Sequence, residues 1–260
     1  MQPITDALQA SIIRQQLGAA TQWLHDIQVF AELDSTNRWM LQQGQCGEVC
    51  LAERQTAGRG RRGRQWESPE GVNLYLSLRW CFAQVPKNLP ILSLVTGLAV
   101  VDALEDCAIT GHGLKWPNDV YYAGRKLGGI LLEAVGSLEQ IVIGIGLNVN
   151  MLPETGAAID QPWVSLREIH GAPMNRNTLA SVIIERLLAR LQTFPQLDVA
   201  QFQQEWQRRD VLDQRPVRVL SGSHVSEGVA CGVDSQGQLQ VRLRGGSIKT
   251  FSSADVSVRM

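Results

Sequence analysis

The residues best suited to chemistry lie between 58 and 64, where the sequence reads GRGRRGR, with Trp66 close behind. Arginine presents a planar, permanently charged fork that binds phosphates and carboxylates. Glycine lets the backbone come close to a ligand and take positive φ. The segment therefore indicates an anionic partner. By itself it leaves three interpretations open: a nucleic acid, a small anionic ligand, or a solvated loop.

Two nucleotide-binding motifs are excluded. The GxGxxG-like spacing at 58–63 would need a helix after it to form a dinucleotide-binding turn, and a strand pattern follows instead. The chain contains no GxxxxGK[ST] motif. Its 24 basic residues are balanced by 25 acidic ones, a net charge of −1, whereas a dedicated nucleic-acid binder is usually basic. The arginine cluster is therefore a local feature.

A second candidate is the segment 115–119, which reads KWPND. Asp119 is suited to coordinate Mg²⁺, Lys115 to neutralise phosphate charge, and Asn118 to hydrogen-bond nearby, so together they suit a metal-bound polyphosphate. The alternative is a β-turn that contains Pro, Asn and Asp for conformational reasons alone.

Two further segments have both a functional and a structural interpretation. Lys126 opens an expected strand directly after a hairpin turn, which would place its charge well, although by itself it fits an ordinary surface lysine better. The segment 144–148 reads GIGLN, and its glycines would let a flat ring lie on the strand or let two elements pack closely. Trp163 suits either stacking on adenine or anchoring the core.

The elements around these residues indicate an α+β fold with a mixed, mostly antiparallel sheet packed with helices. At 72–79 apolar residues alternate with polar ones, which predicts a half-buried strand. The first 26 residues suggest one amphipathic helix that directs Leu8, Ile12 and Leu17 to the core. The other expected elements are strands at 27–33, 49–54, 114–116, 120–122, 126–133 and 140–150, helices at 38–42, 90–106, 178–194 and 199–209, and short alternating strands after 216.

Composition bounds the class of protein. With 260 residues and 44% hydrophobic content, one large and one small domain are expected. The cysteines at 46, 50, 81, 107 and 231 show no zinc spacing, and reduced thiols are expected. No apolar run reaches membrane-spanning length, and the N-terminus does not have a signal-peptide pattern. A cytoplasmic protein is the prediction.

The order of these motifs is more specific than any one of them. Ser35-Thr36-Asn37, Gln55 with GRGRRGR, KWPND, GRKLGGIL at 124–131 and GIGLNVN at 144–150 together resemble the catalytic domain of bacterial biotin protein ligases. The resemblance extends from about residue 27 to the end of the chain. It implies a sheet like those of class II synthetases and biotin/lipoate ligases, followed by a small SH3-like β-barrel. The expected units are 1–26 (helical), 27–212 (ligase) and 213–260 (barrel).

The resemblance also implies an activity and its site. Members of this family use ATP and Mg²⁺ to convert biotin into biotinyl-5′-AMP, and then transfer biotin to a lysine of the biotin carboxyl carrier protein of acetyl-CoA carboxylase. The implied biotin-binding residues are Ser35, Thr36, Asn37, Gln55, Arg59, Gly60, Arg61 and Lys126. The implied ATP- or adenylate-binding residues are Arg59, Arg61, Lys115, Asn118, Asn148 and Trp163. The implied catalytic residues are Lys126, Arg61, Asp119 and Lys115, with Asp119 also the expected magnesium ligand.

Some family members carry an N-terminal winged helix-turn-helix and repress transcription. Fewer than thirty residues precede the first expected strand here, so a form without that domain, and without DNA as a partner, is the expectation. A homodimer through a partly exposed sheet edge is also expected. Two rival functions stay open: a lipoate or acyl-protein ligase on a related fold, and a nucleic-acid-binding module.

Overall fold

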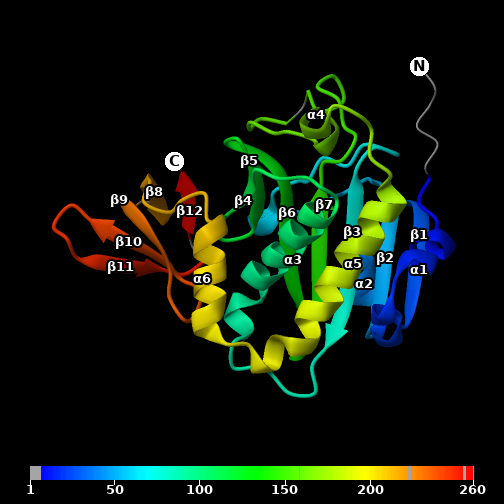
Figure 1. Cartoon of the computed structure of the whole chain (residues 1–260), viewed down its shortest axis with the longest axis horizontal. Helices are drawn as coiled ribbons and strands as arrows, with labels where there is room; N and C mark the ends of the chain where they lie inside the picture. Colours follow the sequence, from blue (N-terminus) through cyan, green and yellow to red (C-terminus); the bar gives the residue numbers. More distant parts are fainter. Residues whose placement is uncertain (1–6, 158, 222–223, 254–255, 260) are drawn as a thin grey trace.

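The computed structural model describes residues 7–157, 159–221, 224–253 and 256–259. Its larger part is a seven-stranded sheet in the order β1-β2-β3-β7-β6-β5-β4, with helices on its faces (Figure 1). Only β1 and β2 run parallel, and the other neighbours are antiparallel. This confirms the predicted mixed, mostly antiparallel sheet. The strands are β1 (Asp26–Leu33), β2 (Glu48–Gln55), β3 (Leu74–Cys81), β4 (His112–Lys115), β5 (Asp119–Tyr122), β6 (Arg125–Val135) and β7 (Ser137–Leu147).

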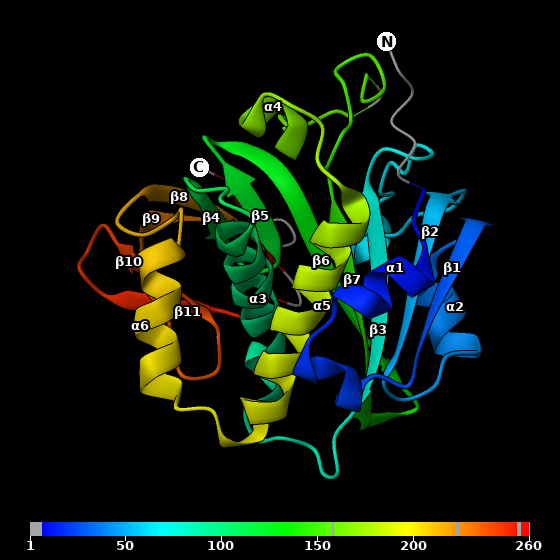
Figure 2. The same cartoon turned by 45° about the vertical axis from the view of Figure 1, so that its right-hand side comes forward.

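The helices cover the two faces of the sheet unequally. Two long helices, α3 and α5, pack together over one face with α1 beside them, whereas α2 packs on the other face (Figures 1 and 2). Along β2, Val49 and Leu51 join the main core while Cys50 joins a separate small cluster with Met40 of α2. The helices are α1 (Ala10–Gln16), α2 (Thr36–Gln42), α3 (Leu92–Asp106), α4 (Leu166–His170), α5 (Arg176–Thr193) and α6 (Val199–Arg209).

Strand β3 differs from its prediction. The alternating pattern predicted a half-buried strand, but every residue from Leu74 to Leu78 is buried. Its second face is covered because α2 packs there, and Ser77 meets Thr36 and Asn37 of that helix. Alternation of polar and apolar residues indicates which side chains face the apolar core, and it does not show that the other face is open to water.

Two smaller elements also differ from expectation. Instead of one long N-terminal helix, α1 is followed by a 3₁₀ turn at Ala19–Trp23, and Ile13 rather than Ile12 is the buried residue of α1. Helix α4 was not predicted. It begins at an N-cap, Ser165, whose hydroxyl accepts from the Glu168 amide, and it ends at Gly171 in the left-handed region.

The C-terminal strands form a second sheet, in the order β11-β10-β9-β8-β12, with all pairs antiparallel. This fits the predicted SH3-like unit. Its β9–β10 turn docks on the larger part, where the Trp116 indole donates to the Gly237 carbonyl at 2.8 Å. The boundaries of the three expected units remain predictions. The strands are β8 (Pro216–Ser221), β9 (His224–Val233), β10 (Leu239–Leu243), β11 (Ile248–Phe251) and β12 (Val256–Arg259).

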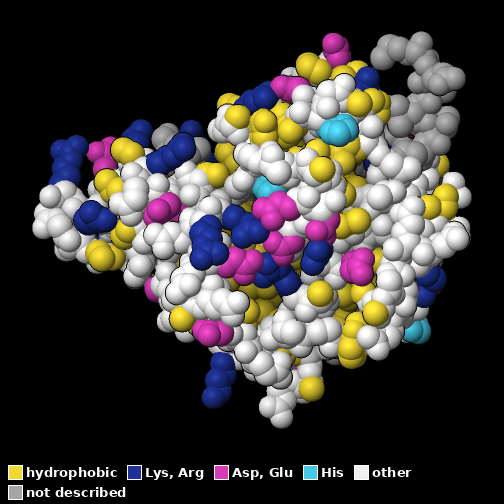
Figure 3. All heavy atoms as spheres, viewed as in Figure 1, with side chains coloured by type: hydrophobic (Ala, Val, Ile, Leu, Met, Phe, Trp, Pro, Cys, Tyr) yellow, Lys and Arg dark blue, Asp and Glu magenta, His cyan; other side chains and the backbone are white. Residues whose placement is uncertain are grey.

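Acidic and basic side chains alternate where α3, α5 and α6 meet, and they gather on the face shown in Figure 3. Asp102 of α3 contacts both Arg190 of α5 and Arg209 of α6. Because the charges form a connected network rather than isolated pairs, the network ties the three helices together. Within the described ranges, no helix is long and apolar enough to cross a membrane.

The cysteines differ from the sequence expectation. Cys46 and Cys81 form a disulfide with a Cα–Cα distance of 5.5 Å, and the free cysteines are Cys50, Cys107 and Cys231. The two partners face each other because β2 and β3 pair in a register that aligns Glu48 with Arg79, two residues from each sulfur. Sequence spacing does not reveal that register, so the expectation of reduced thiols is wrong for this pair.

Thiol counting tests the disulfide directly. In denaturant without reductant we expect three reactive thiols per chain, and five after reduction. The Cys81→Ser variant should show four thiols under both conditions, and its free energy of unfolding should be lower than that of the oxidised parent by about 2–4 kcal/mol. Five thiols in the unreduced parent would contradict the pairing.

Asp210 closes α6 in a buried position. One carboxylate oxygen accepts from the Leu212 amide at 2.8 Å. Burial raises the pKa of Asp210 to about 6. Because the folded chain then holds this proton more tightly than the unfolded chain does, the free energy of unfolding falls as the pH rises from about 4 to about 6.

Replacing Asp210 with asparagine should remove that pH dependence. The amide keeps an oxygen for the Leu212 N–H and carries no charge, so at pH 8 the variant should be more stable than the parent by about 2–3 kcal/mol, as a shift of about two pKa units implies. At pH 4 the two proteins should be equally stable. Urea unfolding at pH 4 and pH 8 measures the free energy of unfolding of both proteins. If the variant and the parent differ by the same amount at the two pH values, the buried charge of Asp210 is not the cause.

Candidate active site

The N-terminus of α2 carries a buried polar cluster. Ser35 is the N-cap, and its hydroxyl accepts from the Arg38 amide. The hydroxyl of Ser77 on β3 lies 2.8 Å from Thr36 Oγ1 and 2.6 Å from Asn37 Oδ1. A Cβ added at Gly144 would stand 2.0 Å from Asn37 Oδ1. The first glycine of GIGLN is therefore required because Asn37 packs on that strand.

Gln55, at the end of β2, joins this cluster to the segment after the arginine loop. Its side-chain oxygen accepts from the Thr36 amide at 2.9 Å, and its nitrogen donates to Ser68 Oγ at 2.9 Å. A Cβ on Gly58 would stand 2.4 Å from the carbonyl oxygen of Trp66. The two legs of the arginine loop (residues 58–64) therefore approach closely at Gly58, where a larger residue does not fit.

The arginine loop itself is a small hairpin. Gly60 N–H donates to the Arg64 carbonyl at 2.7 Å, and Arg59 bridges to Gln65. At its tip Arg62 and Gly63 have φ of 60° and 71°. Gly63 thus meets the expectation of positive φ, whereas Gly60 is extended with φ of −114°.

The loop arginines point to different partners. Arg59 pairs with Glu133 of β6 at 2.8 Å, and Glu133 also accepts from the Asn37 amide at 3.0 Å. Arg61 donates to Asn118 Oδ1 at 3.3 Å and to the carbonyl oxygen of Ser253. Arg61 therefore joins the loop to the KWPND turn and to the segment between the last two strands of the C-terminal sheet.

Trp66 lies flat against the strands that form the floor of the site. A Cβ on Gly146 would stand 2.7 Å from the indole, and one on Gly129 would stand 3.3 Å from it. The Lys126 ammonium is 5.4 Å from the centre of the same ring, within cation–π distance. The second glycine of GIGLN thus accommodates an aromatic ring, and the ring belongs to Trp66.

Lys126 and Asp119 form the most enclosed ion pair of the site. Their side-chain atoms are 2.8 Å apart, and the side chains are only 12% and 20% exposed. Strand pairing between β5 and β6 brings them together. The backbone of Lys126 is fixed from both sides, since its N–H donates to Pro162 and its carbonyl accepts from Val164.

Asn148 and Trp163 contact the backbone of Lys126 and of the segment that pairs with it. The Asn148 amide lies within hydrogen-bond distance of the carbonyls of Lys126 (3.4 Å) and Val164 (3.2 Å). Trp163 bridges to Lys126, and its ring packs on Gly156, where a Cβ would stand 2.2 Å from it. Both residues therefore lie beside Lys126, and their nucleotide-binding role stays a prediction.

Cations outnumber anions around Lys115. Its ammonium donates to the Tyr121 hydroxyl at 3.3 Å. Burial lowers the pKa of Lys115; Lys126 and Arg259 of β12 lower it further, while Asp119 opposes them. Burial and the Asp119 charge raise the pKa of Tyr121 to about 12. Burial also lowers the pKa of Arg61. An added anion would relieve this excess of positive charge.

The described residues contain no group of three or more acidic, histidine or cysteine side chains that could hold a metal ion. Asp119 is the carboxylate nearest the cations, and one of its oxygens already faces Lys126. This donor set fits a magnesium ion that arrives on phosphate oxygens and takes one protein carboxylate. It does not fit a resident metal centre.

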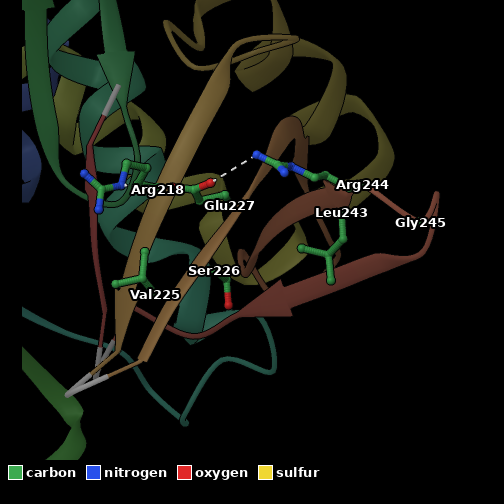
Figure 4. Close-up of a pocket in the computed structure, with 7 residues that line it drawn as sticks. All are labelled: Arg218, Val225, Ser226, Glu227, Leu243, Arg244 and Gly245. Carbon is green, nitrogen blue, oxygen red and sulfur yellow. Dashed lines mark ion pairs between the residues drawn. The ribbon is translucent and has the colours of Figure 1, made fainter.

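Two of the hollows in the described surface are relevant to the position of the site. One, of about 430 Å³, opens beside the arginine loop, and its lining includes Arg61, Pro117, Leu131 and Ser253. The other, of about 560 Å³, lies in the C-terminal sheet between Arg218, Glu227 and Arg244, and none of the predicted site residues lines it (Figure 4). Of the predicted site residues, Arg61 alone is among those that line the first hollow, so the site is defined by the contacts described above rather than by either hollow.

The predicted residues thus come together from distant parts of the chain. Ser35, Thr36, Asn37 and Gln55 form the polar end, while Arg61, Asn118, Asp119 and Lys126 form the charged end. Lys115 stands beside that charged end. Arg59 reaches the polar end through Glu133. The sequence did not identify Glu133, Ser77, Ser253 or Trp66 as residues of the site. Only the position of Trp66, directly after the arginine loop, offered a signal.

Comparisons with known proteins agree with this geometry. The Biotin/lipoate A/B protein ligase family matches residues 29–148, and the Biotin protein ligase C terminal domain matches residues 215–259. The bifunctional ligase/repressor BirA of Escherichia coli is 39% identical over 90% of this chain and 74% of its own length. The biotin--[acetyl-CoA-carboxylase] ligase of Mycobacterium tuberculosis is 35% identical over 95% of this chain and 93% of its own length.

The fold agrees as well. The biotin protein ligase from Aquifex aeolicus, solved in complex with biotin and ATP, superposes with a TM-score of 0.78 at 32% identity, over 90% of this chain and 98% of that one. Both matched models and the near-complete alignment with a relative lead to one conclusion: the chain belongs to the biotin protein ligase family.

Proposed function

We propose that this chain activates biotin with ATP to form biotinyl-5′-AMP and pyrophosphate, and then transfers biotin to a lysine of the biotin carboxyl carrier protein of acetyl-CoA carboxylase. The observation that carries the proposal is the Lys126–Asp119 pair at 2.8 Å. It lies beside Trp66 and faces a surplus of cations. The cations there can offset the repulsion between a carboxylate and a phosphate that approach each other.

The first step joins two anions. The biotin carboxylate attacks the α-phosphorus of ATP, an acyl–phosphate bond forms, and pyrophosphate leaves. Lys126 is assigned to both the carboxylate and the α-phosphate, where negative charge gathers in the transition state. Arg61 is assigned to the carboxylate, and Lys115 to the phosphates. Magnesium, bound to ATP and to Asp119, would neutralise further phosphate charge.

The polar end of the site would hold the ureido group of biotin. Thr36 and Gln55 already present a donor and an acceptor to each other, with Ser35 and Asn37 adjacent. A ureido ring offers matching N–H and carbonyl groups, so it can replace these internal hydrogen bonds with its own. Trp163 and Asn148 are assigned to the nucleotide, beside the backbone of Lys126.

The second step breaks the acyl–phosphate bond. The amine of the carrier lysine attacks the biotinyl carbonyl, an amide forms, and AMP leaves with the phosphate. Lys115 and Asp119 lie where they can orient that amine. The open half of the β6 edge suits docking of the carrier: in the described ranges, β5 pairs with β6 only as far as Gly129, so Leu132 and Ala134 keep an unpaired strand edge. A second copy of this chain would fit the same edge.

One assay separates biotin from its rival substrate. The protein is incubated with MgATP, an apo carrier domain and either labelled biotin or labelled lipoate. We expect label on the carrier lysine with biotin and none with lipoate. Transfer of lipoate instead would favour the related lipoate ligases, which share the matched family model.

A cytoplasmic location is proposed with this function, because acetyl-CoA carboxylase carriers are the expected substrates. The Cys46–Cys81 disulfide is uncommon in a reducing compartment. Thiols can be counted on protein from intact cells that were quenched with acid, which preserves the thiol and disulfide state. The count tests the proposed location as well as the cysteine pairing.

A further inference from the structure

Arg176 lies at a position that helix energetics do not favour. It is the first residue of α5, where the positive end of the helix dipole opposes a cation, and it is only 1% exposed. Both the opposing helix dipole and the burial of the charge lower the stability of the folded protein. The partners of Arg176 therefore indicate what it does.

Two of its partners, Glu53 and Asn73, stand at the two ends of one arm, defined as residues 54–72. This arm contains Gln55, the arginine loop and Trp66. Arg176 Nη1 lies 2.6 Å from Glu53 Oε2, on the leg that leaves the sheet. The same nitrogen donates to the carbonyl of Asn73 at 3.3 Å, on the leg that returns. One guanidinium thus holds both ends of the arm.

The N-terminal segment reinforces this junction. The other oxygen of Glu53 accepts from the Leu8 amide at 2.6 Å, so both carboxylate oxygens are engaged. The carbonyl of Glu53 accepts from the Gly71 amide at 3.1 Å, which links the two legs directly. On the returning leg, the Tyr75 hydroxyl donates to the Pro69 carbonyl at 2.9 Å.

The junction is two residues from the polar end of the site. Glu53 is separated from Gln55 by one residue, and Gln55 bonds both Thr36 and Ser68. A shift of the leg at Glu53 would therefore move Gln55 relative to Thr36. It would also change the angle at which the arginine loop lies over Lys126.

We propose that Arg176 is a positioning residue for the arginine loop: by clamping Glu53 and Asn73 it sets the geometry in which the loop closes over the acyl-adenylate. The inference rests on the proposed function, since it concerns retention of biotinyl-5′-AMP. Arg176 touches no reacting group. Its effect passes through the two legs of the arm.

The test compares two arginines of the same helix. Arg176→Met removes the clamp, and Arg190→Met removes a partly buried arginine that pairs with Asp102 and Glu205, far from the arm. Adenylate is formed on each protein, and its release into solution is timed after rapid dilution. KM for ATP and the urea midpoint are measured in parallel.

For Arg176→Met we expect release about 10-fold faster than in the parent, a size that a small misplacement of a site can produce, with KM for ATP within about twofold. Arg190→Met should lower the urea midpoint and leave the release rate unchanged. Arg176→Lys keeps one cationic contact and should fall between parent and Arg176→Met. Should Arg176→Met fail to fold, Glu53→Gln removes the same ion pair and is expected to act in the same direction.

Failure of the positioning role can be distinguished from failure of the proposed function. If the parent forms adenylate and Arg176→Met retains it as long as the parent does, the positioning role is wrong. Equal acceleration in Arg190→Met would also overturn it, because general loss of stability would then explain both. If the parent forms no adenylate from biotin, the proposed function itself fails.

Discussion

Replacing Lys126 with glutamine is expected to slow the formation of biotinyl-5′-AMP by about 10³-fold, the size of loss that follows removal of one preorganised charge from a transition state. Lys126 is 12% exposed and held 2.8 Å from Asp119, so its charge acts where little water screens it. Its backbone is fixed by Pro162 and Val164, so little reorganisation is needed during the reaction.

Single-turnover pyrophosphate release measures the loss, and Lys87→Gln, an exposed lysine outside the site, is the control. Lys126→Gln should keep most of its biotin affinity because Thr36 and Gln55 are unaltered. The urea midpoint of Lys126→Gln shows whether the protein still folds when Asp119 has lost its ion-pair partner. A loss below about tenfold in a folded variant would mean that Lys126 does not stabilise the transition state.

Replacing Arg61 with glycine should affect retention of the adenylate more than its formation. Arg61 joins the arginine loop to Asn118 and to the Ser253 carbonyl, so its loss detaches the loop from the KWPND turn and from the C-terminal sheet. We expect release of biotinyl-5′-AMP to become about 10²-fold faster, the cost of losing charge-assisted hydrogen bonds worth about 3 kcal/mol in all. Formation should slow by no more than about tenfold.

Arg64→Gly is the matched control for Arg61. It removes one positive charge from the loop and leaves the contacts of Arg61 with Asn118 and Ser253 in place. The comparison therefore separates the loss of a loop charge from the loss of those contacts. Release is followed by chasing labelled adenylate with unlabelled biotin. If Arg61→Gly releases the intermediate no faster than the parent, or if Arg64→Gly releases it equally fast, the loop does not hold the adenylate through Arg61.

The sequence predicted local features of this protein better than distant contacts. The strand at 72–79, the helix at 38–42 and the KWPND turn depend on neighbouring residues, and these elements form near the predicted positions. The burial of Ser77 was not predicted because α2, which covers it, lies about forty positions earlier in the chain. Arg176 gave no signal because Glu53 is 123 residues away.

The glycines of GIGLN illustrate the same limit within the site. Sequence reasoning left open whether they admit a ligand ring or close packing. Gly144 accommodates the Asn37 amide and Gly146 the Trp66 indole, so protein side chains occupy both positions. Each partner comes from another segment of the chain, and spacing within the strand cannot identify it.

The most direct test of the account is to detect the activated acid. The protein is mixed with biotin and MgATP without any carrier, and the nucleotides it retains are identified by native mass spectrometry. We expect about one biotinyl-5′-AMP per chain in the parent, none when lipoate replaces biotin, and strongly reduced formation in Lys126→Gln. Absence of the adduct from a folded parent, or undiminished formation in Lys126→Gln, would contradict the assignment of this site to biotin activation.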